Sequence, residues 1–186
     1  MNGDGYVAKP MSGLWTAIKS GFKNVFNFRG RMRRSDYWMF IVSVIVISVG
    51  LLTGFFYLTE CLPLYRSTMN ENSYELVFML LVVLLAIVFF IIPLLLMLGA
   101  TVRRLHDFGH SGLLAWLTFA CLVSSIISFS VSIIRYDMDD PSELMVWVFI
   151  ITCILVIVTI VLCMKDSMKG VNQYGDSPKW EQRADI

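Results

Sequence analysis

LMVWVFIITCILVIVTIVLCM (residues 144–164) is an uninterrupted apolar stretch without Asp, Glu, Lys, Arg or His. A transmembrane helix needs about 20 mainly apolar residues. Backbone groups in lipid must find their hydrogen bonds within the segment, and this run lacks the alternation of a strand. The stretch therefore predicts a helix that spans a membrane.

Three further runs have the same character, at about 37–58, 76–101 and 113–134. Together the four runs predict an all-α membrane protein with four transmembrane helices. Pro93 lies within the second run, and because proline removes a helical hydrogen bond it predicts a bend there. We expect a cytoplasmic segment 1–36 before the bundle and a cytoplasmic tail 165–186 after it.

The composition excludes an ordinary soluble domain. Hydrophobic residues make up 57% of the 186 residues and charged residues 16%, against about 25% charged in a typical globular protein. Three of the four cysteines lie in apolar runs and no pair has metal-ligand spacing, so we expect unlinked thiols. The first apolar run starts near Tyr37, too late for a cleavable signal peptide, which predicts that it remains as an anchor.

The loop charges predict the orientation. Seven Lys/Arg in the first 36 residues, two in the 102–112 loop and four in the tail place thirteen on one side, whereas Arg66 and Arg135 stand alone on the other. Positive loops remain in the cytoplasm. Both termini and the middle loop are therefore expected to be cytoplasmic, in a multi-pass plasma-membrane protein.

The segment 14–26 carries apolar residues at helical spacing, with Lys19 and Lys23 on the other side. This predicts an amphipathic helix, either flat on the cytoplasmic membrane surface or folded onto the protein's own loops. Trp15, Tyr37 and Trp38 are candidate interfacial anchors, because amphipathic rings favour the headgroup level.

Small residues suggest how the predicted helices pack. Gly50 and Gly54 form a GxxxG pair, and Ser124, Ser128 and Ser132 recur every four residues. Such stripes allow helix backbones to approach closely in lipid. We expect them to be packing surfaces, with a serine-lined polar path as the alternative.

Three polar motifs follow or precede the predicted helices. They are FRGRMRRSDYW (28–38), RRLHDFGHSG (103–112) and NQYGDSP (172–178). If the second helix continues past its apolar run, Arg103 and Asp107 lie one turn apart and can pair. Gly30 in the first motif, and Gly109 and Gly112 in the second, indicate turns.

Topology places all three motifs on the cytoplasmic side, where we expect them to meet in one patch. Its candidate residues combine cationic, acidic and hydrogen-bonding side chains: Arg31, Arg33, Arg34, Arg103, Arg104, His106, Asp107, Asn172 and Tyr174. Arg34 and Arg104 are the first candidates to pair with Asp107. A metal site at His106, Asp107 and His110 is the alternative, but Gly109 should break the spacing between the only two histidines, so we expect no metal and no cofactor.

The ordered patterns FxGRxRRxxYW, RRLHDxxxSG and NxYGxxP resemble the Domain of Unknown Function 805 family over about residues 22–178. Members of that family are small bacterial inner-membrane proteins, so the resemblance implies this location and fold but no activity. The signature positions that it carries over are Gly30, Arg31, Arg33, Arg34, Tyr37, Trp38, Arg103, Arg104, Leu105, His106, Asp107, Ser111, Gly112, Asn172, Tyr174, Gly175 and Pro178.

Three classes of function fit these observations. The favoured hypothesis is a binding or interaction protein whose arginines hold an anionic lipid headgroup, a phosphorylated metabolite or an acidic protein, because arginine suits bidentate phosphate contacts. A transporter or channel is less favoured, since the spans contain no ionisable residue. A membrane-embedded enzyme acting on a lipid-linked substrate would use His106 as acid/base and Asp107 to orient it. Nucleic acid is not an expected partner, and a homo-oligomer or a membrane-protein partner stays open.

Overall fold

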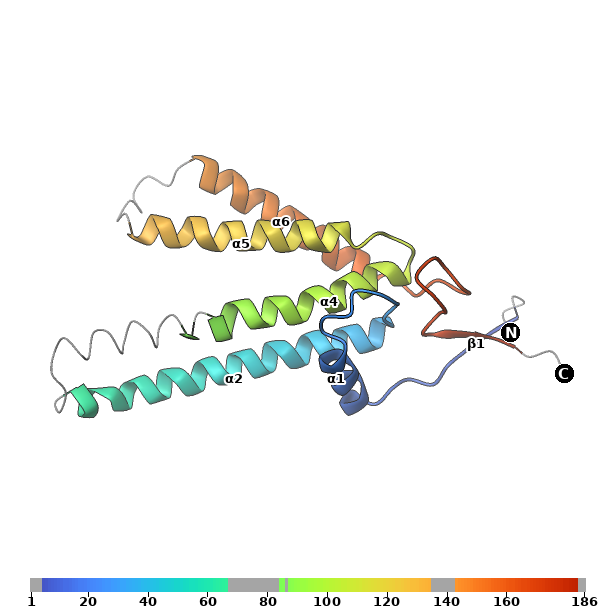
Figure 1. The fold of residues 1–186 in the computed structure, drawn as a ribbon, viewed down its shortest axis with the longest axis horizontal. Helices are drawn as coiled ribbons and strands as arrows, with labels where there is room; N and C mark the ends of the chain where they lie inside the picture. The colour runs from blue at the N-terminus through green and yellow to red at the C-terminus, as the bar shows by residue number, and fades with distance from the viewer. Residues whose placement is uncertain (1–4, 67–83, 86, 135–142, 184–186) are drawn as a thin grey trace.

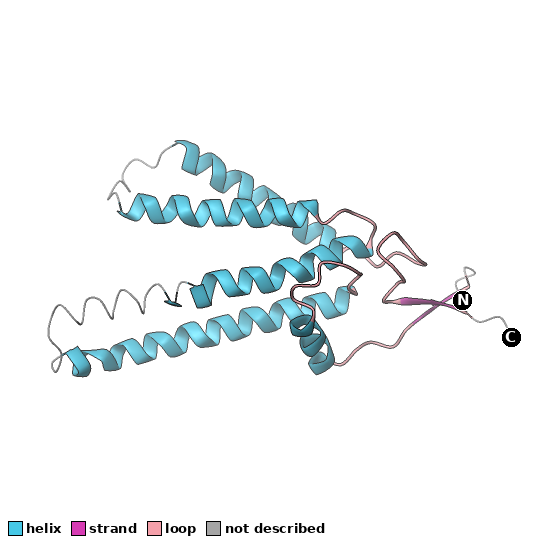
Figure 2. Ribbon diagram, in the orientation of Figure 1, coloured by secondary structure: helices cyan, strands magenta, loops and turns pink. Residues whose placement is uncertain are grey.

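The computed structural model describes residues 5–66, 84–85, 87–134 and 143–183. Over these ranges the protein is mostly helical, with five α-helices, one π-helical turn and two short strands (Figure 2). In chain order they are β1 (Tyr6–Ala8), α1 (Leu14–Lys23), α2 (Arg34–Arg66), η1 (Ile87–Ile91), α4 (Ile92–Asp107), α5 (Leu113–Ile134), α6 (Glu143–Met164) and β2 (Trp180–Gln182).

The four long helices form two pairs, α2 with α4 and α5 with α6 (Figure 1). The pairs come together where α2 and α5 begin and where α4 and α6 end, and they separate toward the other end (Figure 1). We call the first of these the motif end, because the three polar motifs adjoin it. Both chain termini also lie beyond the motif end (Figure 1).

Helix boundaries follow the apolar runs closely at α5 and α6. The predicted third helix coincides with α5, and the predicted fourth begins one residue after α6 does. α2 is longer than its predicted span, because it begins within the arginine motif at Arg34 and continues to Arg66. Among the residues that the structure describes, two helical segments are long and apolar enough to cross a membrane, Arg34–Gly54 and Met145–Met164.

The predicted second span is described only in part, since most of residues 76–86 lie outside the described ranges. Its described portion changes from π-helical to α-helical hydrogen bonding at η1, immediately before α4. Pro93 stands in the first turn of α4, where a missing N–H is tolerated. The π-helical turn η1 is a feature frequent at functional sites, and the bend expected at Pro93 stays a prediction. The acidic loops predicted around residues 67–75 and 135–142 also lie outside the described residues.

Helix α1 crosses α2 near the motif end and is fixed there by two glycines (Figure 1). A side chain at Gly21 would overlap the ring of Phe40, and a side chain at Gly99 in α4 would overlap the backbone carbonyl of Val25. Phe40 is fully buried. The amphipathic helix expected over residues 14–26 therefore exists as a shorter helix, and one of its faces packs on the protein itself.

Hydroxyl groups join α5 to α6. The side-chain oxygens of Thr118 and Thr159 are 3.0 Å apart, and those of Ser125 and Thr152 are 2.8 Å apart. Each of these threonines and serines except Thr159 also donates to a carbonyl in its own or the facing helix. Paired hydroxyls of this kind satisfy polar groups between apolar helices.

The small residues singled out in the sequence do not make these contacts. A side chain added at Gly50 or Gly54 would meet nothing within 4 Å among the described residues, so the GxxxG pair makes no close helix contact with them. Ser124 is exposed, and its neighbour Ser125 faces α6 instead. Ser128, the next member of the stripe, is half-buried, so the packing role of the stripe as a whole stays a prediction.

The two chain ends are joined by a two-stranded antiparallel sheet that the sequence did not predict. Tyr6 pairs with Gln182 and Ala8 with Trp180, and backbone bonds from Lys9 to Lys179 and from Arg183 to Gly5 extend the ladder. The two segments are therefore held side by side at the motif end.

Candidate functional site

The three polar motifs meet at the motif end, as topology predicted. Arg31 from the first motif donates from Nε to Oδ1 of Asp107 in the second motif, at 3.0 Å. The same guanidinium donates to the carbonyls of Gly170 and Gly175, which flank and belong to the third motif. The chain can deliver Arg31 to this position because Gly30 turns it with a φ of +87°, a conformation that favours glycine.

Arg31 has no N–H left for a ligand. Its Nη2 donates to the carbonyls of Asp107 and Met168 at 3.0 and 2.7 Å, which completes five bonds from a group with five N–H donors. Its side chain is 1% exposed. Arg31 therefore fastens the C-terminal loop to the end of α4.

Arg104 is the second partner of Asp107 and is fully buried beside it. Besides the Asp107 carboxylate, it donates to the carbonyl of Met32 in the first motif and to those of Cys163 and Lys165 at the end of α6. Burial lowers the pKa of Arg104, and the charge of Asp107 acts against that shift. We call Arg31, Arg104 and Asp107 the ion-pair cluster.

The prediction that Arg104 pairs with Asp107 is confirmed, whereas the predictions that Arg34 or Arg103 would pair with it are wrong. Arg34 donates instead to the carbonyl of Met164, at 3.4 Å. Arg103 donates from Nε to the carbonyl of Gly99, one turn back in its own helix. Arg31, reached from 76 residues away, takes the place that sequence spacing assigned to them.

His106, Asn172 and Tyr174 form a second set of contacts between the second and third motifs. The rings of His106 and Tyr174 stack 3.7 Å apart at 4°, and the Asn172 amide donates to the His106 carbonyl at 2.9 Å. His106 Nδ1 is 3.3 Å from the carbonyl of Gly30, so this nitrogen carries the proton. Burial lowers the pKa of His106, with the Gly30 contact acting in the opposite direction.

This geometry does not support the acid/base role considered for His106. Both carboxylate oxygens of Asp107 accept from Arg31 and Arg104, so Asp107 does not orient the imidazole. The described ranges contain no group of three His, Cys, Asp or Glu side chains that could hold a metal ion.

A polar pocket of about 260 Å³ lies beside the ion-pair cluster, between α1, the first motif and α4. We call it the arginine pocket. Its lining is rich in cations and amides, with one carboxylate: Ser20, Asn24, Asn27, Arg29, Gly30, Arg31, Met32, Arg33, Asp36, Arg103 and Pro178. Its volume is just below the 300–1,000 Å³ typical of small-molecule sites, which suits a charged group of a ligand.

Arg103 is the unusual member of this pocket. It is 6% exposed, and its Nη2 is buried with no hydrogen-bond partner among the described residues. Burial lowers its pKa, although arginine remains charged in proteins. A buried cationic N–H without an acceptor is costly, so the site is electrostatically prepared for an anion.

The other predicted site residues lie at the edges of these groups. Arg33 donates from Nη1 to the carbonyls of Lys9 and Pro10 and lines the arginine pocket. Trp15 is 75% exposed on α1, as an anchor would be. Tyr37 differs, because it is buried and its hydroxyl lies 3.4 Å from that of Thr101, while Trp38 packs edge-on against its ring.

Sequence reasoning missed the pocket's uncharged wall. Ser20, Asn24 and Asn27 belong to α1 and the turns after it, a segment that was judged only by its apolar face. The available signal was the pair of asparagines close to the arginine motif, because asparagine at a helix end commonly binds backbone groups, as Asn24 does to Ser20.

Comparison with known proteins supports the resemblance. The model of the family described as Protein of unknown function (DUF805) matches residues 25–176, which contain all three motifs apart from the last two residues of the third. Neither the curated proteins nor the solved structures contain a match. Residues 25–176 are most of the chain, and the chain therefore belongs to the DUF805 family of proteins of unknown function.

Proposed function

We propose that this protein is a four-span membrane protein with its motif end in the cytoplasm, and that its arginine pocket binds an oxyanion such as a phosphate group. One observation carries the binding part of the proposal: Arg103 lines a cationic pocket, and its buried Nη2 has no acceptor among the described residues. The membrane part rests on exposure and charge.

Exposed apolar surface supports insertion in a membrane. Only 22% of the apolar stretch of α2 and 17% of the apolar stretch of α6 is buried within the protein. A core helix of a soluble protein would be mostly buried, and soluble proteins rarely expose apolar patches beyond a few hundred Å². Lipid is the solvent that accommodates these faces.

The terminal sheet supports an even number of crossings. Because β1 and β2 are hydrogen-bonded to each other, the two chain ends must lie on one side of any membrane. The arginines of the motif end favour the cytoplasmic side. Apolar residues of α1 and α2, including Leu14, Ile18, Trp38 and Val42, line one groove, which would place α1 at the interface.

Reporter fusions test the topology. Green fluorescent protein fused after Ile186 should fluoresce, because it folds in the cytoplasm, and alkaline phosphatase fused after Asn70 should be active outside. A dark C-terminal fusion with normal membrane expression would contradict the proposed orientation.

Within the arginine pocket, the donors available to a ligand come from Arg103, Arg29 and Arg33, whereas Arg31 is saturated. Asp36 is the one carboxylate in the lining, and it already accepts from Ser12 and Ser35. The charge balance of the pocket is positive. Guanidinium groups bind phosphate and carboxylate with paired N–H bonds, which fits an oxyanion better than a neutral ligand.

Thermal unfolding in detergent tests this binding, because a ligand that binds only the folded state stabilises it by about 2.7 kcal/mol at one hundred times its Kd. Inorganic phosphate should raise the Tm saturably, and Arg103→Met should abolish the rise. Arg34→Met is the matched control, since Arg34 lies outside the pocket and should keep it.

The source of the oxyanion is resolved by a second probe. If phosphate alone has no effect, mixed micelles with phosphatidylglycerol should raise the Tm in an Arg103-dependent way, which would assign a lipid headgroup. Absence of Arg103 dependence with both probes would overturn the proposal.

A further inference from the structure

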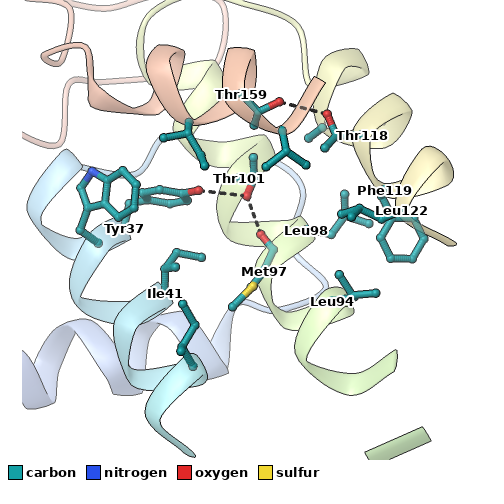
Figure 3. A pocket seen from close by; sticks show the side chains of 15 residues that line it. Tyr37, Ile41, Leu94, Met97, Leu98, Thr101, Thr118, Phe119, Leu122 and Thr159 are labelled. Carbon is teal, nitrogen blue, oxygen red and sulfur yellow. Dashed lines mark hydrogen bonds between the residues drawn. The ribbon is translucent and has the colours of Figure 1, made fainter. Parts of the chain in front are cut away.

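An apolar cavity of about 270 Å³ lies between α2, α4, α5 and α6, away from the arginine pocket (Figure 3). Its walls include Ile41 from α2, Leu94 and Leu98 from α4, and Phe119 and Leu122 from α5 (Figure 3). All four long helices contribute, so the cavity is a feature of the whole bundle.

The few polar groups of the cavity bind one another. The hydroxyls of Tyr37 and Thr101 are 3.4 Å apart, and Thr101 also donates to the carbonyl of Met97 (Figure 3). Thr118 and Thr159 are paired across α5 and α6. Since the lining hydroxyls are already paired, the cavity is suited to an apolar occupant.

At the motif end α2 is joined to α6, and toward the other end the two helix pairs separate (Figure 1). Arg34 donates to the carbonyl of Met164 at the motif end, which joins the start of α2 to the end of α6. Beyond that point α2 packs closely on α4 but not on α5 or α6 over the described residues. The route into the cavity therefore runs sideways, between α2 and α6, where lipid chains would lie.

The rim of this opening is cationic. Arg34 is exposed at the start of α2, and Lys165 is exposed directly after α6. Asp166 is also there, but Lys179 pairs with it, and this pair with Arg34 nearby lowers the pKa of Asp166 despite its partial burial. Asp166 thus lies near Lys179 and Arg34 and follows Lys165 in the chain, so cations outnumber carboxylates here, an arrangement that complements an anionic headgroup.

We propose that the cavity holds a hydrocarbon chain of an anionic membrane lipid, inserted between α2 and α6 with its headgroup at Arg34 and Lys165. The inference uses the proposed membrane orientation and is independent of the arginine pocket. It accounts for an apolar cavity, whose hydroxyl groups are hydrogen-bonded within the protein, next to a cationic rim.

Photocrosslinking tests the chain site. The full-length protein is reconstituted with phosphatidylglycerol that carries a diazirine in its acyl chain, and crosslinked peptides are identified by mass spectrometry. Crosslinks to the cavity wall in α4 and α6 are expected. Val156→Trp should fill the cavity and reduce them several-fold, whereas Ile157→Trp, whose side chain points outward and is 60% exposed, should retain them.

The headgroup part of the proposal is tested with a second probe, a phosphatidylcholine that carries the same diazirine in its acyl chain. Crosslinking by this zwitterionic probe is compared with crosslinking by the anionic phosphatidylglycerol probe. Arg34→Gln should remove the preference for the anionic probe, and Lys19→Gln, an exposed cation on α1, should keep it. If Val156→Trp fails to fold, Leu122→Phe fills the cavity from α5. Crosslinks confined to outward-facing residues, or equal use of both probes by the wild type, would overturn the proposal. Arg103→Met should leave the crosslinks unchanged, which separates this site from the oxyanion site.

Discussion

Arg103 and Arg104 are neighbours in the sequence, and the structure puts them in opposite chemical situations. Arg104 donates to one carboxylate and three carbonyls within the ion-pair cluster. Arg103 donates to one carbonyl of its own helix and leaves a buried N–H without an acceptor in the described structure. The comparison distinguishes arginines that stabilise the fold from an arginine that can bind a ligand. A guanidinium whose N–H groups are all bonded within the protein cannot also bind a ligand.

The largest effect should come from the cluster's only carboxylate. Asp107→Asn removes the charge between two buried arginines, and breaking a buried pair in this way costs about 3–5 kcal/mol. Asp166→Asn is the matched control, since its pair with Lys179 is partly exposed and worth about 0–1 kcal/mol. Reversible unfolding in detergent measures both, and similar losses would mean that the cluster is not a structural centre.

The second effect compares the two neighbouring arginines directly. Arg104→Met should lower the free energy of unfolding by about 3 kcal/mol, less than Asp107→Asn, because Arg31 still pairs with Asp107. Arg103→Met should change it by at most about 1 kcal/mol, since it also removes an unpaired buried donor. Equal destabilisation by both would contradict the division of roles drawn here.

The third effect should fall on the arginine pocket and spare the cluster. Gly99 accepts the Nε bond of Arg103, and an added methyl group would overlap the Val25 carbonyl, so Gly99→Ala should cost about 1–3 kcal/mol and weaken phosphate binding. Gly50→Ala is the control, because open space surrounds that glycine among the described residues. Unchanged phosphate binding in a destabilised Gly99→Ala variant would show that the pocket tolerates movement of α1.

The smallest effect should be a pH dependence from His106. Burial lowers the pKa of its folded form, so the unfolded chain binds more protons below the ordinary value of about 6.5. Stability should therefore be complete above about pH 6.5 and decrease as the pH falls from there toward the lower folded pKa. His106→Gln should flatten this decrease, and an equal change in the control His110→Gln would contradict the assignment.

The sequence predicted the helices and their meeting point well. α5 and α6 are almost as expected because their apolar runs are continuous and end at glycines or charges. The convergence of the three motifs followed from topology alone, since each motif adjoins a helix terminus on one side. Asp107 was predicted to pair with an arginine of this patch for the same reason, and the structure adds that the pair is buried.

The sequence could not predict which side chains would meet. The partnership of Arg31 with Asp107 depends on the positive φ of Gly30 and on a loop 137 to 144 residues away, and spacing within a helix carries no information about either. The strands β1 and β2 are three residues each and pair only with each other, so they have almost no local signal. A GxxxG pattern shows that a close approach is permitted at Gly50 and Gly54, but not that a neighbour is there.

The loop carbonyls that hold Arg31 have a consequence for biosynthesis. Met168, Gly170 and Gly175 are made 137 or more residues after Arg31. At roughly 5–20 residues per second, a ribosome needs about 7 to 30 seconds to produce them. Throughout that interval α2, η1, α4, α5 and α6 are made while this guanidinium lacks three of its acceptors. The segment translated last therefore completes the contacts of Arg31, and a ribosome that stops shortly after α6 releases a chain that has all the described helices but lacks these contacts at its motif end.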